Sequence, residues 1–134
     1  MFGVLDISAS ALTAQRTRLN VIAANMANQN TTHDADGNYA PFRRRIAILA
    51  TGDPTTGSSQ GVPVQEIQMD PAPFRKAYEP GNPDADSEGY VNYPNIDPAM
   101  EMINALEASR AYEANITVAE ATKGMLNAAL QLLA

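Results

Sequence analysis

The separation of proline from alanine constrains the fold of this 134-residue chain more than any other feature. All nine Pro residues lie between Pro41 and Pro98, whereas 16 of the 23 Ala residues lie in residues 1–32 and 96–134. Proline breaks helix interiors, and alanine has the highest helix propensity. We therefore expect an N-terminal helix in 1–32, an irregular middle region in 33–95 and a C-terminal helix in 96–134.

The N-terminal part carries a heptad repeat. Its first row has members seven residues apart: Leu5, Leu12, Leu19 and Met26. A second row follows three residues later: Ser8, Gln15 and Ile22. This spacing is typical of a coiled-coil seam and predicts a helix from about residue 4 to 28, roughly 37 Å long. Residues 28–32 should end it, because Asn accepts the left-handed C-cap and Thr prefers extended backbone.

The C-terminal part opens with a helix start signal. Asp97 suits the N-cap, Pro98 suits the first helical position, and Glu101 lies in the first turn. The seam predicted for this helix consists of Met102, Ala105, Ser109, Tyr112, Ile116, Ala119, Lys123, Leu126, Leu130 and Leu133. Two long terminal helices with similar seams predict an antiparallel coiled-coil-like pair. The expected fold class is mainly α with a small β part.

The middle region predicts short strands. Residues 39–50 predict a first strand, and residues 62–69 predict a second strand that pairs with it as a β-hairpin. The composition of residues 51–61 indicates the connecting loop. Residues 70–95 are rich in Pro and should be mostly extended, because residues before Pro avoid the helical region. One short strand is expected at 89–93.

Charge and amino-acid content exclude several classes of function. The net charge of −6 argues against a nucleic-acid partner. No run of about 18 apolar residues is present, so insertion into a membrane is not expected. The start lacks the features of a cleaved secretory signal, which predicts a cytosolic chain unless it is exported without cleavage. With no Cys and a single His, at position 33, we expect no catalytic, metal or cofactor site.

Two alternative functions stay open on the residues alone. Asp84, Asp86, Glu88 and Gly89 occupy the first, third, fifth and sixth positions of an EF-hand-like pattern. The twelfth position holds Asn95 instead of the bidentate Glu that such a loop requires. A small acidic calcium-binding module is therefore one alternative, although it lacks this ligand, and a soluble coiled-coil adaptor is the other.

Three consecutive arginines occur in the first predicted strand. Because neighbouring strand residues alternate between faces, Arg43 and Arg45 should point one way and Arg44 the other. The charges could protect a solvated strand edge. They could equally pair with an acidic surface on an adjacent subunit.

Several apolar residues lie off the two seams: Ile7, Val21, Met100, Ile103, Leu106 and Leu132. Each terminal helix can cover one face of the other, and the middle region is too small to cover the rest. Uncovered apolar surface of this kind marks an association site.

Long stretches of the chain resemble the flagellar rod and hook axial protein family. The segment "ALTAQRTRLNVIAANMANQNTT" is similar to the N-terminal motif that these proteins share, with a variant of the usual Asn-Ile-Ala-Asn-type ending. "YAPFRRRIAIL" resembles the segment that follows it. "GNPDADSEGYVNYPN", followed by "EM" and "SRAYEAN", resembles the proximal-rod type in particular. The resemblance covers nearly the whole chain.

The resemblance implies a structural subunit of the flagellar basal-body proximal rod. Such subunits leave the cytoplasm through the flagellar type III export apparatus without a cleaved signal. They assemble into a hollow helical drive shaft that crosses the periplasm and transmits torque, with both terminal helices in the inner helical domain. The implied partners are rod proteins of the FlgB, FlgF and FlgG types, the adaptor FliE at the rod base, and further copies of the chain.

Under this interpretation the assembly interface combines helical rows with polar residues. It consists of Leu5, Leu12, Leu19, Ile22, Met26, Asn25, Asn28, Arg43, Arg45, Ile116, Leu126, Leu130 and Leu133. The apolar N-terminal members should pack on the four C-terminal members, within a subunit and against neighbours. Asn25, Asn28 and Asn30 should cap the first helix and form hydrogen bonds where the chain leaves it.

Overall fold

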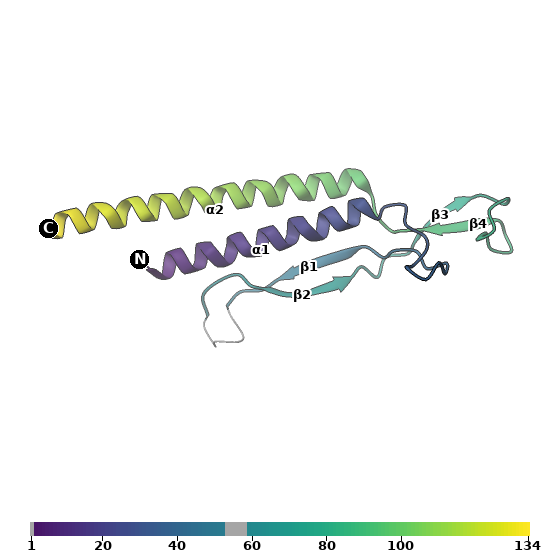
Figure 1. The fold of residues 1–134 in the computed structure, drawn as a ribbon, viewed down its shortest axis with the longest axis horizontal. Coiled ribbons are helices and arrows are strands. Elements are labelled where there is room, and N and C mark those ends of the chain that lie inside the picture. The colour runs from purple at the N-terminus through teal and green to yellow at the C-terminus, as the bar shows by residue number, and fades with distance from the viewer. Residues whose placement is uncertain (1, 53–58) are drawn as a thin grey trace.

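A computed structural model describes residues 2–52 and 59–134. Helix α1 covers Phe2–Ala27 and helix α2 covers Pro98–Leu133. The two helices run antiparallel along one elongated body, with the strands between them in sequence (Figure 1). This arrangement confirms the predicted fold class, mainly α with a small β part. Neither helix is both long and apolar enough to span a membrane, within the residues that were placed.

Helix α1 ends where the polar residues begin. Asn28 Nδ2 donates to the carbonyl of Ala24 at 2.8 Å, and Thr31 Oγ1 donates to Asn28 Oδ1 at 3.1 Å. The Ala24 carbonyl, which also accepts from the backbone N–H of Asn28 at 3.1 Å, thus has a second donor in the last turn of the helix. The predicted capping role of Asn28 is met by its side chain, but the left-handed C-cap predicted for Asn is wrong, because no described residue other than Gly has a positive φ.

Helix α2 starts as its sequence predicts. Asp97 has extended backbone angles, its Oδ1 accepts from the N–H of Ala99 at 3.0 Å, and Pro98 follows at the first helical position. With 36 residues, α2 is about 54 Å long, whereas the 26 residues of α1 span about 39 Å. The C-terminal end of α2 therefore extends beyond the start of α1 (Figure 1).

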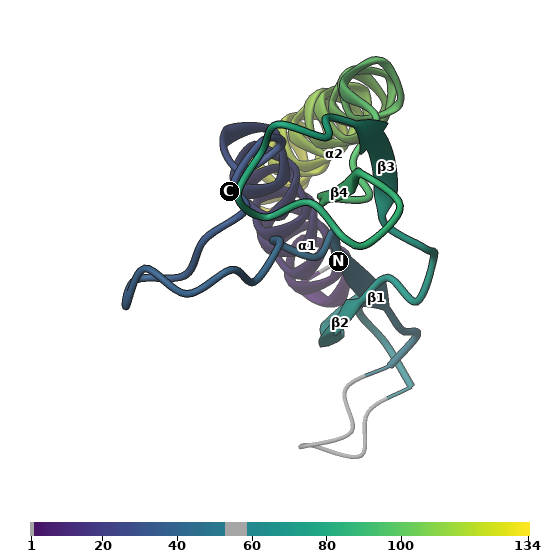
Figure 2. The same cartoon turned by 90° about the vertical axis from the view of Figure 1, so that its right-hand side faces the viewer.

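The first two strands form the predicted antiparallel hairpin. Strand β1, Arg45–Leu49, pairs with β2, Val64–Met69, and the register changes between Ile48 and Leu49. Of the predicted loop 51–61, residues 53–58 lie outside the described part of the chain. The hairpin packs on α1 through β1, so α1 lies between α2 and the hairpin (Figure 2).

A second antiparallel pair lies beyond the end of the helix pair (Figure 1). Strand β4, Tyr90–Tyr93, was predicted, but its partner β3, Arg75–Tyr78, was not. The connection needs Gly89, which has a φ of 86° and would place a Cβ 3.0 Å from the ring of Tyr78. Strand β3 was not predicted because the prolines and turn residues around it favour irregular structure.

The face that α2 turns inward differs from the predicted seam. Its buried residues are Glu101, Ala108 and Thr122, multiples of seven apart, and a half-buried row runs beside them: Ala105, Tyr112, Ala119 and Leu126. The second row was in the predicted seam, but Met102, Lys123, Leu130 and Leu133 are exposed. The first row was missed because none of its members is a large apolar residue. Ala108 and Thr122 are small enough for close helix approach, and Glu101 is buried together with its ion pair to Arg44. Leu130 and Leu133 lie near the overhanging end of α2 (Figure 1).

The buried face of α1 is small or polar along most of its length, with Val21 and Ile22 as its larger apolar members near β1. Its buried residues are Ser8, Ala11, Ala14, Val21, Ile22 and Asn25. The predicted first row, Leu5, Leu12, Leu19 and Met26, is only half-buried. The Leu and Met side chains of the predicted row thus flank the buried face of α1, where Ser8, Ala11 and Ala14 are small.

Candidate assembly interface

Five polar residues from separate elements meet where the helices, the hairpin and the β3–β4 pair join. We call this group the polar junction: Asn25, Arg44, Asp70, Asn95 and Glu101. Glu101 is only 1% exposed although it is charged. Arg44 Nε donates to Glu101 Oε1, and Arg44 Nη1 donates to Asp70 Oδ2 at 3.0 Å. A buried carboxylate thus has the paired, hydrogen-bonded environment that makes burial tolerable.

Asn25 joins three elements through one amide. Its Nδ2 donates to the carbonyl of Arg45 at 2.8 Å and to Glu101 Oε2 at 3.4 Å, while its Oδ1 accepts from the N–H of Arg45 at 2.9 Å. The side chain therefore pairs with β1 as a neighbouring strand would. The prediction that Asn25 caps α1 is wrong, because its polar atoms bind β1 and α2.

Asn95 closes the other side of the junction. Its Oδ1 accepts from the backbone N–H of Arg44 at 2.8 Å, and its Nδ2 donates to the carbonyl of Ala72 at 3.1 Å. Arg43 Nη1 donates to the same carbonyl at 2.8 Å and to the carbonyl of Asp70 at 2.9 Å. The segment that follows β2 is thereby held against the segment that precedes β1.

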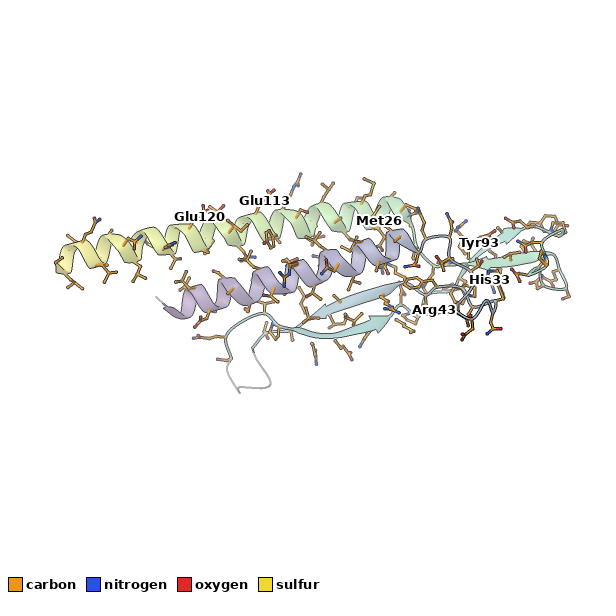
Figure 3. All side chains as sticks on the ribbon, in the orientation of Figure 1. Met26, His33, Arg43, Tyr93, Glu113 and Glu120 are labelled. Atoms are coloured by element: carbon orange, nitrogen blue, oxygen red, sulfur yellow. The ribbon has the colours of Figure 1, made fainter. Side chains whose placement is uncertain are left out.

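The three arginines have three different environments. Arg44 points into the junction, as the predicted alternation suggests. The guanidinium of Arg43 lies 4.2 Å from the ring centroid of Phe74, and Figure 3 labels Arg43 near the start of β1. Arg45 stays exposed, with its guanidinium 5.3 Å from the ring centroid of Phe42. Arg43 is thus engaged within the chain, and a role between subunits stays a prediction for both Arg43 and Arg45.

The junction favours the charged forms of Arg44 and Asp70. Burial opposes the charge of Arg44, but hydrogen bonds to Glu101 and Asp70, together with their charges, raise its pKa above the ordinary value. The hydrogen bond from the N–H of Ala72 has the largest effect on Asp70 and lowers its pKa, while burial acts in the opposite direction. The hydrogen bond from Arg44 and its positive charge lower this pKa further. Arg44 and Asp70 therefore remain ionised at neutral pH and form an ion pair there.

The acidic residues weighed as calcium ligands serve other contacts. Asp86 Oδ1 accepts from the N–H groups of Glu88 and Tyr90, both at 2.9 Å. Asp84 Oδ2 lies 3.1 Å from Nε2 of His33, which Figure 3 shows near the strand pair. In residues 2–52 and 59–134, no three His, Asp or Glu side chains are grouped to hold a metal ion. Nothing in this region supports the calcium alternative.

The side of α2 opposite the polar junction carries a second helical stripe. We call it the outer seam: Ile103, Leu106, Arg110, Ala114, Thr117, Ala121, Gly124, Ala128 and Leu132. Its members are spaced three and four residues apart, and every one is exposed. A Cβ built on Gly124 would meet no atom within 4 Å. Figure 3 shows Glu113 and Glu120 also directed away from α1.

The outer seam has the composition of a helix-packing surface. Apolar side chains lie at its ends, where Leu132 is 89% exposed, and small residues lie at its centre. Small side chains allow another helix to approach closely, and an exposed apolar stripe of this length marks an association site. The sequence had indicated Ile103, Leu106 and Leu132 as uncovered but had not joined them into one face.

The residues predicted for the interface divide by exposure. Ile22 and Asn25 are buried, and most of the others are half-buried: Leu5, Leu12, Leu19, Met26, Asn28, Arg43, Ile116 and Leu126. Arg45, Leu130 and Leu133 are exposed, so neither of these two leucines is buried against α1 within one chain. Their packing against neighbouring subunits stays a prediction.

Both helices match known protein families. The family model described as Flagella basal body rod protein matches residues 5–32, and the model described as Flagellar basal body rod FlgEFG protein C-terminal matches residues 87–132. The chain is 41% identical to the flagellar basal-body rod protein FlgC of Bacillus subtilis, over 98% of this chain and 97% of that protein. The proteins of the same name from Yersinia enterocolitica and Salmonella typhimurium are 42% and 40% identical, with the same coverage.

Proposed function

The chain belongs to the flagellar basal-body rod protein FlgC family and is a structural subunit of the rod, and we propose that it builds the proximal rod by packing the outer seam of α2 against sister subunits. The single observation that carries this proposal is that α2 turns small and polar residues toward α1 and exposes large apolar ones. The face toward α1 is centred on Glu101, Ala108 and Thr122, whereas Ile103 and Leu106 point to solvent. A helix that leaves such residues exposed gains apolar burial only on association.

The proposed assembly includes other rod components. We assign this chain contacts with rod proteins of the FlgB, FlgF and FlgG types, with the adaptor FliE at the rod base and with its own copies. A heterologous contact that does not close on itself generates a helical filament, which is the form a hollow drive shaft requires. Torque would then pass between subunits through packed helices, from the motor toward the hook.

The proposed route to this site is the flagellar type III export apparatus, which delivers the chain to a rod that spans the periplasm. A chain without Cys forms no disulfide that would block passage in an unfolded state. The helix pair is held in its centre mainly by small side chains, so the C-terminal end of α2, which extends beyond α1, can remain loosely folded until neighbouring subunits bury it. The subunit is therefore suited to transport before assembly.

Ala121→Glu tests the outer seam. The variant places a charge at the centre of the proposed contact, and we expect a strain that carries it in place of the natural chain to lose swimming while cellular protein levels stay unchanged. Asn127→Glu is the matched control, because it adds the same charge to α2 at an exposed position six residues away and off the outer seam. Full motility of the Ala121→Glu strain would contradict the proposal.

A further inference from the structure

A cavity lies at the end of the helix pair where α2 begins. It has a volume of about 600 Å³, and its mainly apolar lining includes Ala72, Pro73, Ile96 and Pro98, together with Asn30 and Arg75. These residues come from the turn after α1, the start of β3 and the segment that leads into α2. The volume lies within the range of pockets that hold small ligands or protruding side chains.

The opposite end of α2 carries an unpaired apolar group. Leu132 is 89% exposed and Leu133 is 86% exposed, and Leu130 is exposed one turn earlier. Figure 1 shows this end of α2 extending beyond the start of α1, so neither α1 nor the hairpin covers it. The chain thus exposes a protruding apolar end and an apolar cavity at opposite ends of the same helix.

We propose that this cavity receives the C-terminal end of α2 from a second copy of the chain. The inference rests on the proposed self-assembly and names one contact within it. The chain's own α2 cannot fill the cavity, because its 36 residues hold the two ends about 54 Å apart. A contact between opposite ends of one molecule repeats without closing on itself, as a filament requires.

The charges at the two surfaces are complementary. The cavity lies at the N-terminal end of α2, which carries the partial positive charge of the helix dipole, and Arg75 adds a full positive charge. The incoming end of α2 presents unpaired carbonyls and partial negative charge. Among the lining residues the one carboxylate belongs to Asp97, which already accepts from the N–H of Ala99. Charge complementarity and the burial of apolar surface therefore both favour binding of the α2 end from a second copy.

Cysteine crosslinking tests this contact directly, because the natural chain contains no Cys. The Ala72→Cys and Leu132→Cys proteins are purified separately, mixed at high concentration and treated with a short bismaleimide. We expect a crosslinked dimer that contains one copy of each variant. Lys76→Cys replaces Ala72→Cys as the matched control, since Lys76 is exposed on β3 next to Arg75 but points to the other face of the strand. This pair should crosslink little.

A charge reversal sharpens the test. Arg75→Glu in the Ala72→Cys protein should lower the yield of the crosslinked dimer about fivefold, because it opposes the negative end of the incoming helix. Lys76→Glu should leave the yield nearly unchanged. Equal effects of the two reversals would overturn the proposed orientation of the incoming helix.

Sedimentation of the same mixtures separates failure of this inference from failure of the proposed function. Association without the crosslink between positions 72 and 132 would overturn the cavity contact and leave self-assembly standing. Absence of any association at millimolar concentration would overturn the self-assembly and the contact together. The crosslink could also form only with another rod protein that carries the equivalent helix end. That result would show that the occupant of the cavity is not a second copy of this chain.

Discussion

The two ends of the helix pair differ in what holds them. At the end where α2 begins, the polar junction joins both helices and the hairpin through Arg44, Glu101 and Asn25. At the other end, Leu132 and Leu133 face solvent and nothing in the described chain covers them. We call the end with the polar junction the closed end, because its polar groups are paired within the chain. We call the end with Leu132 and Leu133 the open end, because these side chains face solvent.

This difference indicates that the contacts that fix the arrangement of elements within one subunit are separate from the apolar surface that is free to bind other subunits. Hydrogen bonds and ion pairs depend strongly on geometry, so the junction selects one arrangement of α1, α2 and β1. Apolar burial is non-directional and roughly proportional to area, so it can be left for contacts between subunits. Placing the directional contacts inside the subunit fixes the shape that the outer seam then presents.

Arg44→Ala should break the closed end and give the largest effect. It leaves Glu101 as a buried carboxylate without its guanidinium partner, which costs about 3–5 kcal/mol in comparable buried pairs. Urea unfolding followed by circular dichroism measures the loss. Arg45→Ala, at the exposed neighbouring position, should cost less than about 1 kcal/mol. Equal losses for the two variants would show that the junction does not hold this end.

Asn25→Ala should have the second largest effect. The variant removes the amide that pairs with both backbone groups of Arg45 and with Glu101, and we expect a loss of about 2 kcal/mol in the free energy of unfolding. Asn20→Ala is the control on the exposed side of α1 and should change this free energy by less than about 0.5 kcal/mol. Hydrogen exchange of the β1 amides should accelerate in the first variant alone.

Acid should weaken the closed end through Asp70. Its lowered pKa means that the folded chain binds a proton at Asp70 more weakly than the unfolded chain does. The ionised carboxylate therefore stabilises the fold above its ordinary pKa of 3.8, and this contribution is lost as the pH falls below that value. Asp70→Asn should make the unfolding free energy fall less steeply below about pH 4, as urea unfolding at a series of pH values would show.

Substitutions at the open end should have the smallest effect on the single chain. Leu132→Ser and Leu133→Ser remove side chains that are already in water, so the free energy of unfolding should change by less than about 0.5 kcal/mol. Ala108→Leu, at a fully buried position of the same helix, should cost about 1–3 kcal/mol through overpacking. A large loss on changing Leu132 in the dilute protein would mean that this end is covered after all.

Local signals predicted most of the elements correctly. Asp97 and Pro98 start α2, Asn28 caps α1, and the strands of the first hairpin pair as their composition indicates. Each signal acts between residues close in sequence or depends on a simple alternation. Strand β3 was missed because the prolines and turn residues around it favour irregular structure, and only pairing with β4 makes it a strand.

The rotation of α2 could not be predicted in the same way. A seam chosen by hydrophobicity includes Met102 and Leu130, but α1 packs where side chains are small and where Glu101 meets Arg44. That ion pair joins residues 57 positions apart, and no local pattern reports it. The alternation of the three arginines did place Arg44 apart from its neighbours, and this was the available signal for the junction. The predicted interface residues remain to be tested in an assembled rod.

The bonds of Asn25 and Arg44 lie between elements that run nearly parallel along the body. A lengthwise slip of α2 by one turn, about 5.4 Å, would separate Glu101 from both partners at once. Stress applied along or around the body therefore loads these bonds in shear, all together, instead of peeling them apart in succession. For a structural subunit of the rod, such a joint keeps the β part aligned with the helices.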